Sequence, residues 1–106
     1  MTKQYVKVGR ENEIPEGEVR VFEVEGTGVA IAKVDGKLFA IEDVCTHDDG
    51  PLGEGFLEGC EIECPRHGAR FDVRTGAATR MPAAAPVAVF AVKVENGEVL
   101  IEVETE

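Results

Sequence analysis

Residues 29–41 read Val-Ala-Ile-Ala-Lys-Val-Asp-Gly-Lys-Leu-Phe-Ala-Ile, and this stretch decides the class of fold. Two runs rich in apolar and β-branched residues, 29–34 and 37–41, flank the dipeptide Asp35-Gly36. Asp-Gly between two such runs is a strong signal for a β-hairpin, because a type I′ turn needs positive φ at both central positions. The stretch therefore predicts two antiparallel strands joined by a tight turn.

Similar signals lie on both sides of this hairpin. Residues 19–24 are apolar at alternate positions and end before Gly26-Thr27-Gly28. Towards the end of the chain, residues 87–94 and 99–103 flank the turn-forming sequence of residues 95–98, Glu-Asn-Gly-Glu. No stretch of ten or more residues carries a convincing 3.6-residue apolar stripe. We therefore expect an all-β fold.

The length and the charge limit the class of protein. A chain of 106 residues is near the common size of a single domain and can bury an ordinary core. It has 21 acidic and 11 basic residues, which give a formal net charge of −10. Because phosphate binding needs a basic surface, we expect no nucleic-acid partner. The acidic surface suits a cationic partner, and a solvated surface without any partner explains the charge equally well.

The chain shows no sign of a membrane or secretory segment. Residues 1–5 contain no apolar signal-peptide core, and no apolar run is long enough to span a bilayer. Three cysteines are an odd number and imply no disulfide framework. We therefore expect a cytoplasmic protein that does not associate with membranes.

Two short runs between the predicted strands each pair a thiol with an imidazole: Cys45-Thr46-His47 and Cys64-Pro65-Arg66-His67. They contain both histidines of the protein and two of its three cysteines. They lie in residues 43–86, which are rich in glycine and proline and so predict loops on a β-scaffold. Two cysteines and two histidines in this arrangement fit a 2Fe–2S centre in which two histidines replace two cysteines on one iron.

A zinc site is the main alternative, because zinc also binds thiolate and imidazole. Zinc sites of this composition usually place two cysteines in one half-motif and two histidines in the other. Here each half-motif supplies one of each, which favours the iron–sulfur centre. A purely structural role for all four residues is a second alternative, although the two pairs use every histidine in the chain.

The pattern as a whole resembles the Rieske family motif. The matching positions are Cys45-x-His47, Cys64-Pro65-x-His67-Gly68, Phe71-Asp72, Thr75-Gly76 and a following proline, Pro82. The resemblance extends over the whole chain and is strongest to the ferredoxins of bacterial ring-hydroxylating dioxygenase systems. It implies a single Rieske domain, residues 1–106, built as a Rieske-like antiparallel β-sandwich. The basal sandwich would comprise residues 1–42 and 83–106, with a cluster-binding subdomain, residues 43–82, inserted in it.

The resemblance also implies a site and a role. One 2Fe–2S cluster would be bound by Cys45, His47, Cys64 and His67, which are then both the cofactor-binding and the metal-ligating residues. The histidines would bind iron through Nδ1 and leave Nε2 near solvent for electron transfer. The protein would be an electron carrier and not an enzyme. It would take electrons from a flavin-dependent reductase and pass them to an oxygenase or another reductase subunit.

No histidine is left to build the mononuclear iron site of a catalytic oxygenase subunit. Two other roles stay open at this point. One is the small subunit of an assimilatory nitrite reductase, a family that shares the fold but in which many members lack the ligands. The other is an accessory role in iron–sulfur cluster assembly or in redox sensing.

The chain departs from the high-potential branch of the family. Rieske subunits of respiratory cytochrome complexes carry a disulfide whose positions correspond here to Gly50 and Arg66. Their hydroxyl donors to cluster and cysteine sulfur correspond to Ala69 and Phe71. Fewer donors to sulfur stabilise the reduced state less. We therefore expect a potential near the low end of the Rieske range, about −150 mV.

Several neighbours of the two runs carry expectations of their own. Cys60 precedes Cys64 by four residues, about 13 Å of extended chain, so we expect a small buried residue and not a ligand. Arg70, Asp72 and Arg74 alternate with apolar residues and should share an outward face.

Glycine and proline positions near the runs predict loop geometry. Gly68 and Gly76 should serve backbone conformations that other residues adopt poorly. The segment Met81-Pro82-Ala83 should cover the cluster and exclude water from it.

The cluster and the zinc site differ in colour and in metal content. Protein purified anaerobically from iron-replete cells should be red-brown, contain labile sulfide and give a reduced-state EPR signal of low average g. Metal and sulfide analysis together with EPR checks this. A colourless preparation with stoichiometric zinc and no labile sulfide would contradict the cluster.

Overall fold

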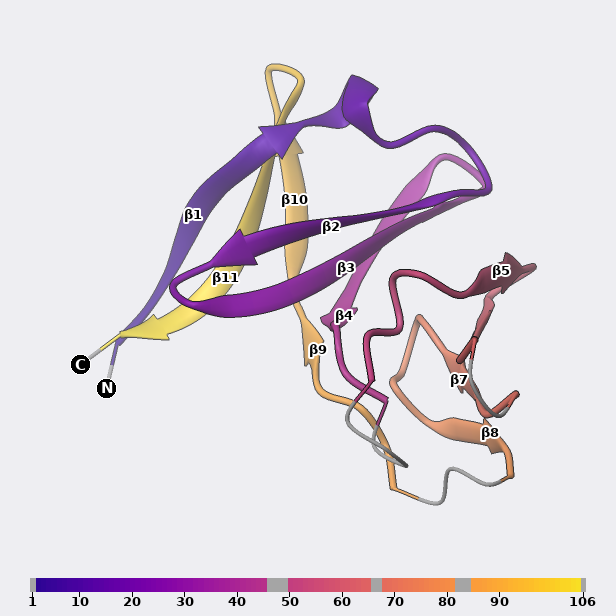
Figure 1. The fold of residues 1–106 in the computed structure, drawn as a ribbon. Helices are drawn as coiled ribbons and strands as arrows, with labels where there is room; N and C mark the ends of the chain where they lie inside the picture. Colours follow the sequence, from indigo (N-terminus) through magenta and orange to yellow (C-terminus); the bar gives the residue numbers. More distant parts are fainter. Residues whose placement is uncertain (1, 46–49, 66–67, 82–84, 106) are drawn as a thin grey trace.

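The computed structural model describes residues 2–45, 50–65, 68–81 and 85–105, and these form three antiparallel sheets (Figure 1). The basal sheet has the strand order β1-β11-β10, the central sheet β2-β3-β4-β9, and the ligand sheet β5-β6-β7-β8. The strands are β1 (Thr2–Arg10), β2 (Val19–Val24), β3 (Thr27–Val34), β4 (Lys37–Glu42), β5 (Phe56–Glu58), β6 (Glu61–Glu63), β7 (Arg70–Asp72), β8 (Ala78–Arg80), β9 (Val89–Phe90), β10 (Val92–Glu95) and β11 (Glu98–Thr105).

Within these residues the structure contains one short 3₁₀ turn, η1 (Glu11–Glu13), and no α-helix. The prediction of an all-β fold is therefore confirmed. None of the described elements is a helix long and apolar enough to cross a membrane.

The tight turn at Asp35-Gly36 is present as predicted. Its two residues have φ of 52° and 77°, and Val34 lies opposite Lys37 in the register of β3 and β4. Positive φ at both positions is what a type I′ turn requires, and its twist matches that of the flanking strands. A residue outside the hairpin also holds this turn, because the amides of Asp35 and Gly36 each donate a hydrogen bond to the Glu16 carboxylate at 2.8 Å.

The hairpin between β2 and β3 turns at Glu25-Gly26, with φ of 53° and 81°. Val24 consequently pairs with Thr27, and β3 begins there and not at Val29 as the sequence pattern suggested. Thr27 and Gly28 are part of the strand because β2 provides hydrogen-bonding partners along its whole length.

Strand β3 is buried on both faces. Val29, Ala30, Ile31 and Ala32 are each at most 2% exposed. Successive side chains of a strand point to opposite faces, so the alternation divides them between two cores. Val29 and Ile31 belong to the basal core, which lies between the central and basal sheets, whereas Ala30 and Ala32 belong to the ligand-side core.

The ligand-side core joins the central sheet to the ligand sheet. Its buried members are Ala30, Ala32, Ile41, Cys45, Leu52, Ile62, Cys64, Ala69, Phe71, Val73 and Val87. Figure 1 shows the ligand sheet as a separate unit that follows β4 and precedes β9 in the chain. Both cysteines of the predicted site therefore lie in a core that the central sheet helps to build.

The single strand predicted over residues 87–94 is wrong. The chain forms β9, which pairs with β4 in the central sheet, and then β10, which pairs with β11 in the basal sheet. The change of sheet falls at Ala91, whose carbonyl accepts a hydrogen bond from the Glu102 amide at 2.9 Å. A continuous apolar run cannot reveal this change, because both halves have the composition of a strand.

Gly76 joins the ligand sheet to the chain that returns to the central sheet. Its φ is +82°, and its carbonyl accepts a hydrogen bond from the Val87 amide at 2.8 Å. A Cβ at this position would lie 2.2 Å from the Val87 carbonyl oxygen. Gly17 has a similar φ of +78°, but nothing lies within 4 Å of its Cβ position.

A comparison of Gly17 with Gly76 distinguishes the cost of a left-handed backbone conformation from the cost of a steric clash. We expect Gly17→Ala to destabilise the protein by about 1 kcal/mol, the cost of a left-handed conformation for a residue with a Cβ. Gly76→Ala should cost about 2 to 4 kcal/mol, because the backbone must also move away from Val87. Chemical denaturation of both variants measures the difference. Equal losses would show that the contact with Val87 is easily relaxed.

Candidate cluster-binding site

Cys45 and Cys64 each lie in the chain that leaves a strand, and both are buried. Cys45 follows β4, Cys64 follows β6 directly, and they are 0% and 1% exposed. Both belong to the ligand-side core, and the three cysteines of the chain form no disulfide with one another. The other two predicted ligands, His47 and His67, lie outside the described residues.

Each cysteine begins a loop that a backbone hydrogen bond closes. The Cys45 amide donates to the Gly50 carbonyl at 2.7 Å, and the Cys64 amide donates to the Ala69 carbonyl, also at 2.7 Å. The acceptor is five residues after the cysteine in both loops, so each closed loop contains one predicted histidine ligand. The same type of backbone hydrogen bond therefore closes both half-motifs.

Gly68 completes the second loop. Its amide donates to the Cys64 carbonyl at 3.1 Å, and its φ is +77°. A left-handed φ is readily adopted only by glycine, so the chain turns back towards β7 at this residue. The predicted backbone role of Gly68 is confirmed, as is that of Gly76.

Asp43 anchors the first loop to the central sheet. Its Oδ1 accepts a hydrogen bond from the Gly53 amide at 2.6 Å, and its own amide donates to the Gly28 carbonyl at 2.9 Å. A Cβ on Gly53 would lie 2.1 Å from Cγ2 of Val21, which shows how closely the loop packs on β2. Sequence reasoning missed Asp43, and a lone aspartate after a strand gives no signal of such a partner.

The surroundings of the cysteines are apolar. Ala69, Phe71, Leu52 and Ile62 are all fully buried and share the ligand-side core with them. A thiolate is costly in such surroundings unless its charge is compensated. Iron–sulfur clusters are bound by thiolates, and soft metals select the same ligand. The two buried cysteines therefore fit the sulfur half of the predicted ligand set.

Among the described residues, no three histidine, cysteine, aspartate or glutamate side chains gather closely enough to hold a metal ion. The two histidines lie outside those residues. The segment expected to cover the cluster is described only in part. Met81 is 77% exposed, whereas Pro82 and Ala83 lie outside the described residues.

The expectation that Cys60 is buried is wrong. Cys60 is half-buried and lies with Gly59 in the turn between β5 and β6, where Glu58 pairs with Glu61. Its carbonyl accepts a hydrogen bond from the Val73 amide at 2.8 Å. The alternation of a strand does not continue through a tight turn, so the spacing from Cys64 did not fix the direction of Cys60.

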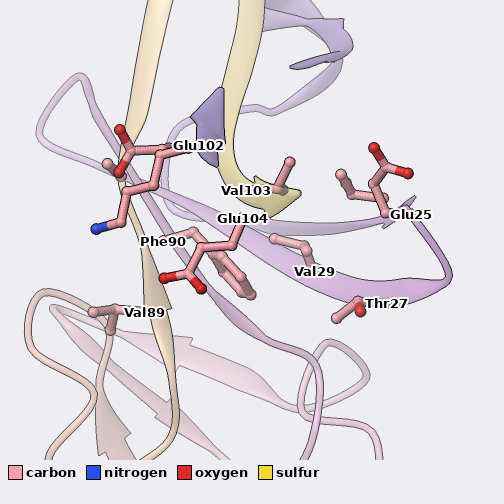
Figure 2. A pocket seen from close by; sticks show the side chains of 11 residues that line it. Glu25, Thr27, Val29, Val89, Phe90, Glu102, Val103 and Glu104 are labelled. Carbon is pink, nitrogen blue, oxygen red and sulfur yellow. The ribbon is translucent and has the colours of Figure 1, made fainter. Parts of the chain in front are cut away.

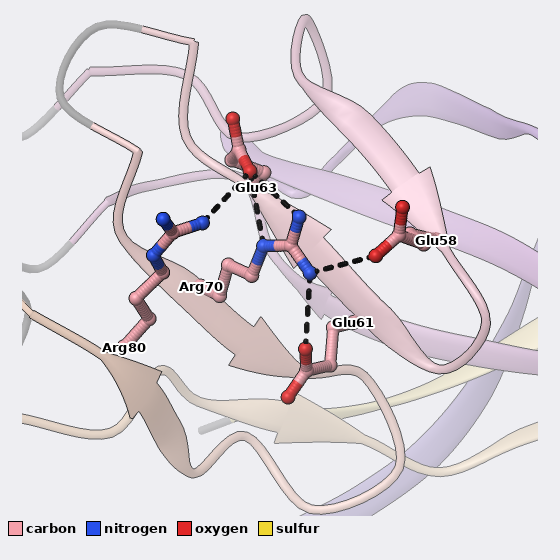
Figure 3. A network of polar contacts seen from close by, with 5 residues as sticks. All are labelled: Glu58, Glu61, Glu63, Arg70 and Arg80. Atoms are coloured by element: carbon pink, nitrogen blue, oxygen red, sulfur yellow. Dashed lines mark hydrogen bonds and ion pairs between the residues drawn. The ribbon is translucent and has the colours of Figure 1, made fainter.

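The outer face of the ligand sheet is charged, as the alternation of residues 69–74 predicted. Ala69, Phe71 and Val73 are buried, and the three charged residues between them are half-buried or exposed. Arg70 is the centre of a network with three glutamates and Arg80 (Figure 3). Its hydrogen bonds to Glu58 first, and then to Glu63, raise the pKa of the guanidinium.

A second ion pair lies at the end of β7. Arg74 donates to Asp72 through its amide at 2.8 Å and through Nη2 at 2.9 Å. The side-chain hydrogen bond from Arg74 lowers the pKa of Asp72 below its ordinary value. The pair therefore contributes stability above the unfolded-state pKa of an aspartate, and loses it as the pH falls through the lower folded-state pKa.

A groove of about 410 Å³ opens elsewhere, between the ends of β3, β9 and β11 (Figure 2). Its lining comprises Lys3, Val24, Glu25, Thr27, Val29, Val89, Phe90, Ala91, Glu102, Val103 and Glu104. No cysteine lines this groove, so it is separate from the predicted cluster site.

Comparison with known proteins identifies the family. The profile described as "Rieske [2Fe-2S] domain" matches residues 4–91. The ferredoxin component of the naphthalene 1,2-dioxygenase/salicylate 5-hydroxylase systems of a Ralstonia species is 39% identical over 104 residues, which cover 98% of this chain and 100% of that protein.

Two solved structures are similar in fold and sequence. The ferredoxin of carbazole 1,9a-dioxygenase from Nocardioides aromaticivorans IC177 has a TM-score of 0.89 and 35% identity, covering 92% of this chain and 96% of that one. A chain in a complex of reduced oxygenase and oxidized ferredoxin in carbazole 1,9a-dioxygenase has a TM-score of 0.86 and 38% identity, covering 92% and 91%.

The chain therefore belongs to the Rieske 2Fe–2S domain family. The comparisons confirm the predicted family, its single 2Fe–2S cluster and the role of an electron carrier in place of a catalyst. They also confirm the Rieske-like β-fold, because the structural match extends over nearly the whole chain.

The different burial of the cysteines predicts their reactivity. In the native protein a maleimide should label Cys60 readily and leave Cys45 and Cys64 unmodified, because those two are at most 1% exposed. Peptide mass spectrometry identifies the labelled site. Cys60→Ala should abolish labelling and keep the visible absorbance of the cluster. Labelling of Cys45 or Cys64 in the folded protein would contradict their burial.

Proposed function

We propose that this protein carries one electron at a time on a Rieske cluster bound by Cys45, His47, Cys64 and His67. The observation that carries the proposal is the burial of both cysteines at the start of two loops closed in the same way. The two histidines of the chain belong to these same loops by sequence. Residues 43–82 are then the cluster-binding subdomain, and residues 1–42 and 83–106 the basal sandwich.

When bound, the cluster supplies the site that is reduced and reoxidised. The two thiolates provide the anionic ligands, and the neutral imidazoles add no charge. A cluster with these ligands is therefore easier to reduce than a cluster bound by four cysteines. Leu52, Ile62 and Phe71 exclude water from the side of the cysteines that faces the core. Exclusion of water from this side tunes the potential of the cluster.

Two buried positions support a low potential. Ala69 and Phe71 are both 0% exposed and share the core with the cysteines. Neither side chain carries a hydroxyl group, so neither can donate a hydrogen bond to sulfur. The reduced state therefore lacks two stabilising donors that high-potential relatives have, and the potential should lie near the low end of the range, about −150 mV.

We further propose that the protein passes electrons from a flavin-dependent reductase to a terminal oxygenase in the cytoplasm. The similar ferredoxins support the acceptor, because one of them is found in a complex with its oxygenase. The net charge of −10 would attract a partner with a cationic docking face. The choice of reductase as donor rests on the resemblance to the ferredoxins of dioxygenase systems.

Anaerobic mixing tests this function directly. The chemically reduced protein should transfer one electron per cluster to the oxidised oxygenase component of a naphthalene 1,2-dioxygenase, seen as coupled absorbance changes in a stopped-flow experiment. Protein-film voltammetry should give a potential near the low end of the Rieske range, about −150 mV.

The matched control is Cys64→Ser, which should lose the cluster absorbance and the transfer together. Transfer of the intact cluster to an apo-acceptor, without electron transfer, would instead indicate a role in cluster assembly. A clearly positive potential would contradict the low-potential assignment.

A further inference from the structure

The base of the loop that contains Cys64 is formed by Glu63 and Arg70. These residues lie opposite each other as the last register pair of β6 and β7. The backbone bond from Cys64 to Ala69 is the next contact along the hairpin. Cys64 points into the core and Glu63 to the outer face, because successive strand residues alternate. The contacts of the Glu63 side chain therefore restrain the residue immediately before Cys64.

Arg70 makes an unusually complete set of contacts at this base (Figure 3). Its Nε and Nη2 each lie 2.9 Å from Oε1 of Glu63. Its Nη1 lies 3.0 Å from Oε1 of Glu58 and 3.3 Å from Oε1 of Glu61. One guanidinium thus ties β5, β6 and β7 together, which a lysine, as a point charge on a flexible stem, cannot reproduce.

The network is partly shielded from water. The side chains of Arg70 and Glu63 are 22% and 28% exposed, in contrast to 77% for Glu58. The contact with Glu63 is therefore less screened than an exposed surface ion pair. Arg80 approaches the same glutamate, with its Nη1 3.5 Å from Oε1.

Without Arg70, the three carboxylates would repel one another. Glu58 and Glu61 are directly opposite in the register of β5 and β6, and like charges in that position destabilise a strand pair. Arg80 contacts Glu63, at the Cys64 end of this pair of strands. Removal of the guanidinium would leave net negative charge on the sheet that ends at Cys64.

Glu63 is also fixed through its backbone. A Cβ on Gly55 would lie 1.8 Å from the Glu63 carbonyl oxygen, so the loop before β5 packs directly on this peptide. Arg70 fixes the side chain of Glu63, and Gly55 limits movement of its carbonyl. The position of the next residue, Cys64, depends on both restraints.

We propose that Arg70 is a positioning residue for the cluster: it fixes the base of the Cys64 loop and offsets the negative charge of three glutamates behind it. The inference deepens the proposed function, because it rests on Cys64 as a cluster ligand. It gives Arg70 two separable effects. The fork of hydrogen bonds holds the loop, and the positive charge favours the reduced state of the cluster.

Three variants of the cluster-loaded protein separate these effects. Arg70→Gln removes both the charge and the fork, whereas Arg70→Lys keeps the charge and loses the fork. Arg74→Gln is the matched control, because it removes the same charge from a neighbouring ion pair with Asp72. The readouts are the lifetime of the visible absorbance in excess iron chelator, the potential by protein-film voltammetry, and the thermal midpoint.

Arg70→Gln should lose its cluster about fivefold faster than the wild type, the factor that corresponds to about 1 kcal/mol. Its potential should shift to more negative values, because added negative charge disfavours reduction. Arg70→Lys should shorten the cluster lifetime and leave the potential near that of the wild type. Arg74→Gln should keep both quantities near the wild-type values.

Two results would overturn the proposal: wild-type lifetime and potential in Arg70→Gln, or the same changes in Arg74→Gln. If Arg70→Gln does not fold, as judged by its thermal midpoint, Arg70→Lys decides, and a wild-type lifetime in that variant rejects the fork. A wild-type protein that binds no cluster would contradict the proposed function itself. Cluster binding by the wild type is therefore measured first, before any variant is compared with it.

Discussion

The double burial of strand β3 is the constraint on which the rest of the structure depends. Val29 and Ile31 face the basal core, and Ala30 and Ala32 face the ligand-side core. The valine and isoleucine fill the space between two sheets, whereas the alanines are short enough for the ligand unit to lie close to the central sheet. The central sheet is thus the shared wall of both cores, and the cysteine loops are held against a surface that cannot readily move.

The ligand unit separates apolar and charged groups across a thin sheet. Phe71 and Val73 line the interior with the two cysteines, while Arg70 and the glutamates lie on the outside. The period of two along β6 and β7 produces this division. A cluster bound by these cysteines would be kept from water on the side that faces the core, and the charged residues of β6 and β7 would lie one residue away from the cysteine Cys64. Both conditions act on the potential of an iron–sulfur cluster.

Local patterns predicted what depends on neighbouring residues. Asp35-Gly36 predicted its turn because Asp-Gly is preferred where both central residues need positive φ, and the two cysteine–histidine runs predicted a metal centre from their residue types and arrangement. The predictions that were wrong assumed that a strand continues unbroken. Residues 87–94 change sheet at Ala91, and Cys60 lies in a turn where strand alternation has ended.

The sequence by itself determined the all-β class, the two half-motifs and the alternation that places charge outside and hydrocarbon inside the ligand unit. The tertiary structure decided that Gly50 and Ala69 close the two cysteine loops, and that Asp43 and Arg70 hold these loops in place. The reason is physical: these partners lie five to ten residues apart across loops, a spacing outside the alternation of a strand, so the contacts between them leave no periodic trace in the sequence. They exist only once the loops have folded back on the strands.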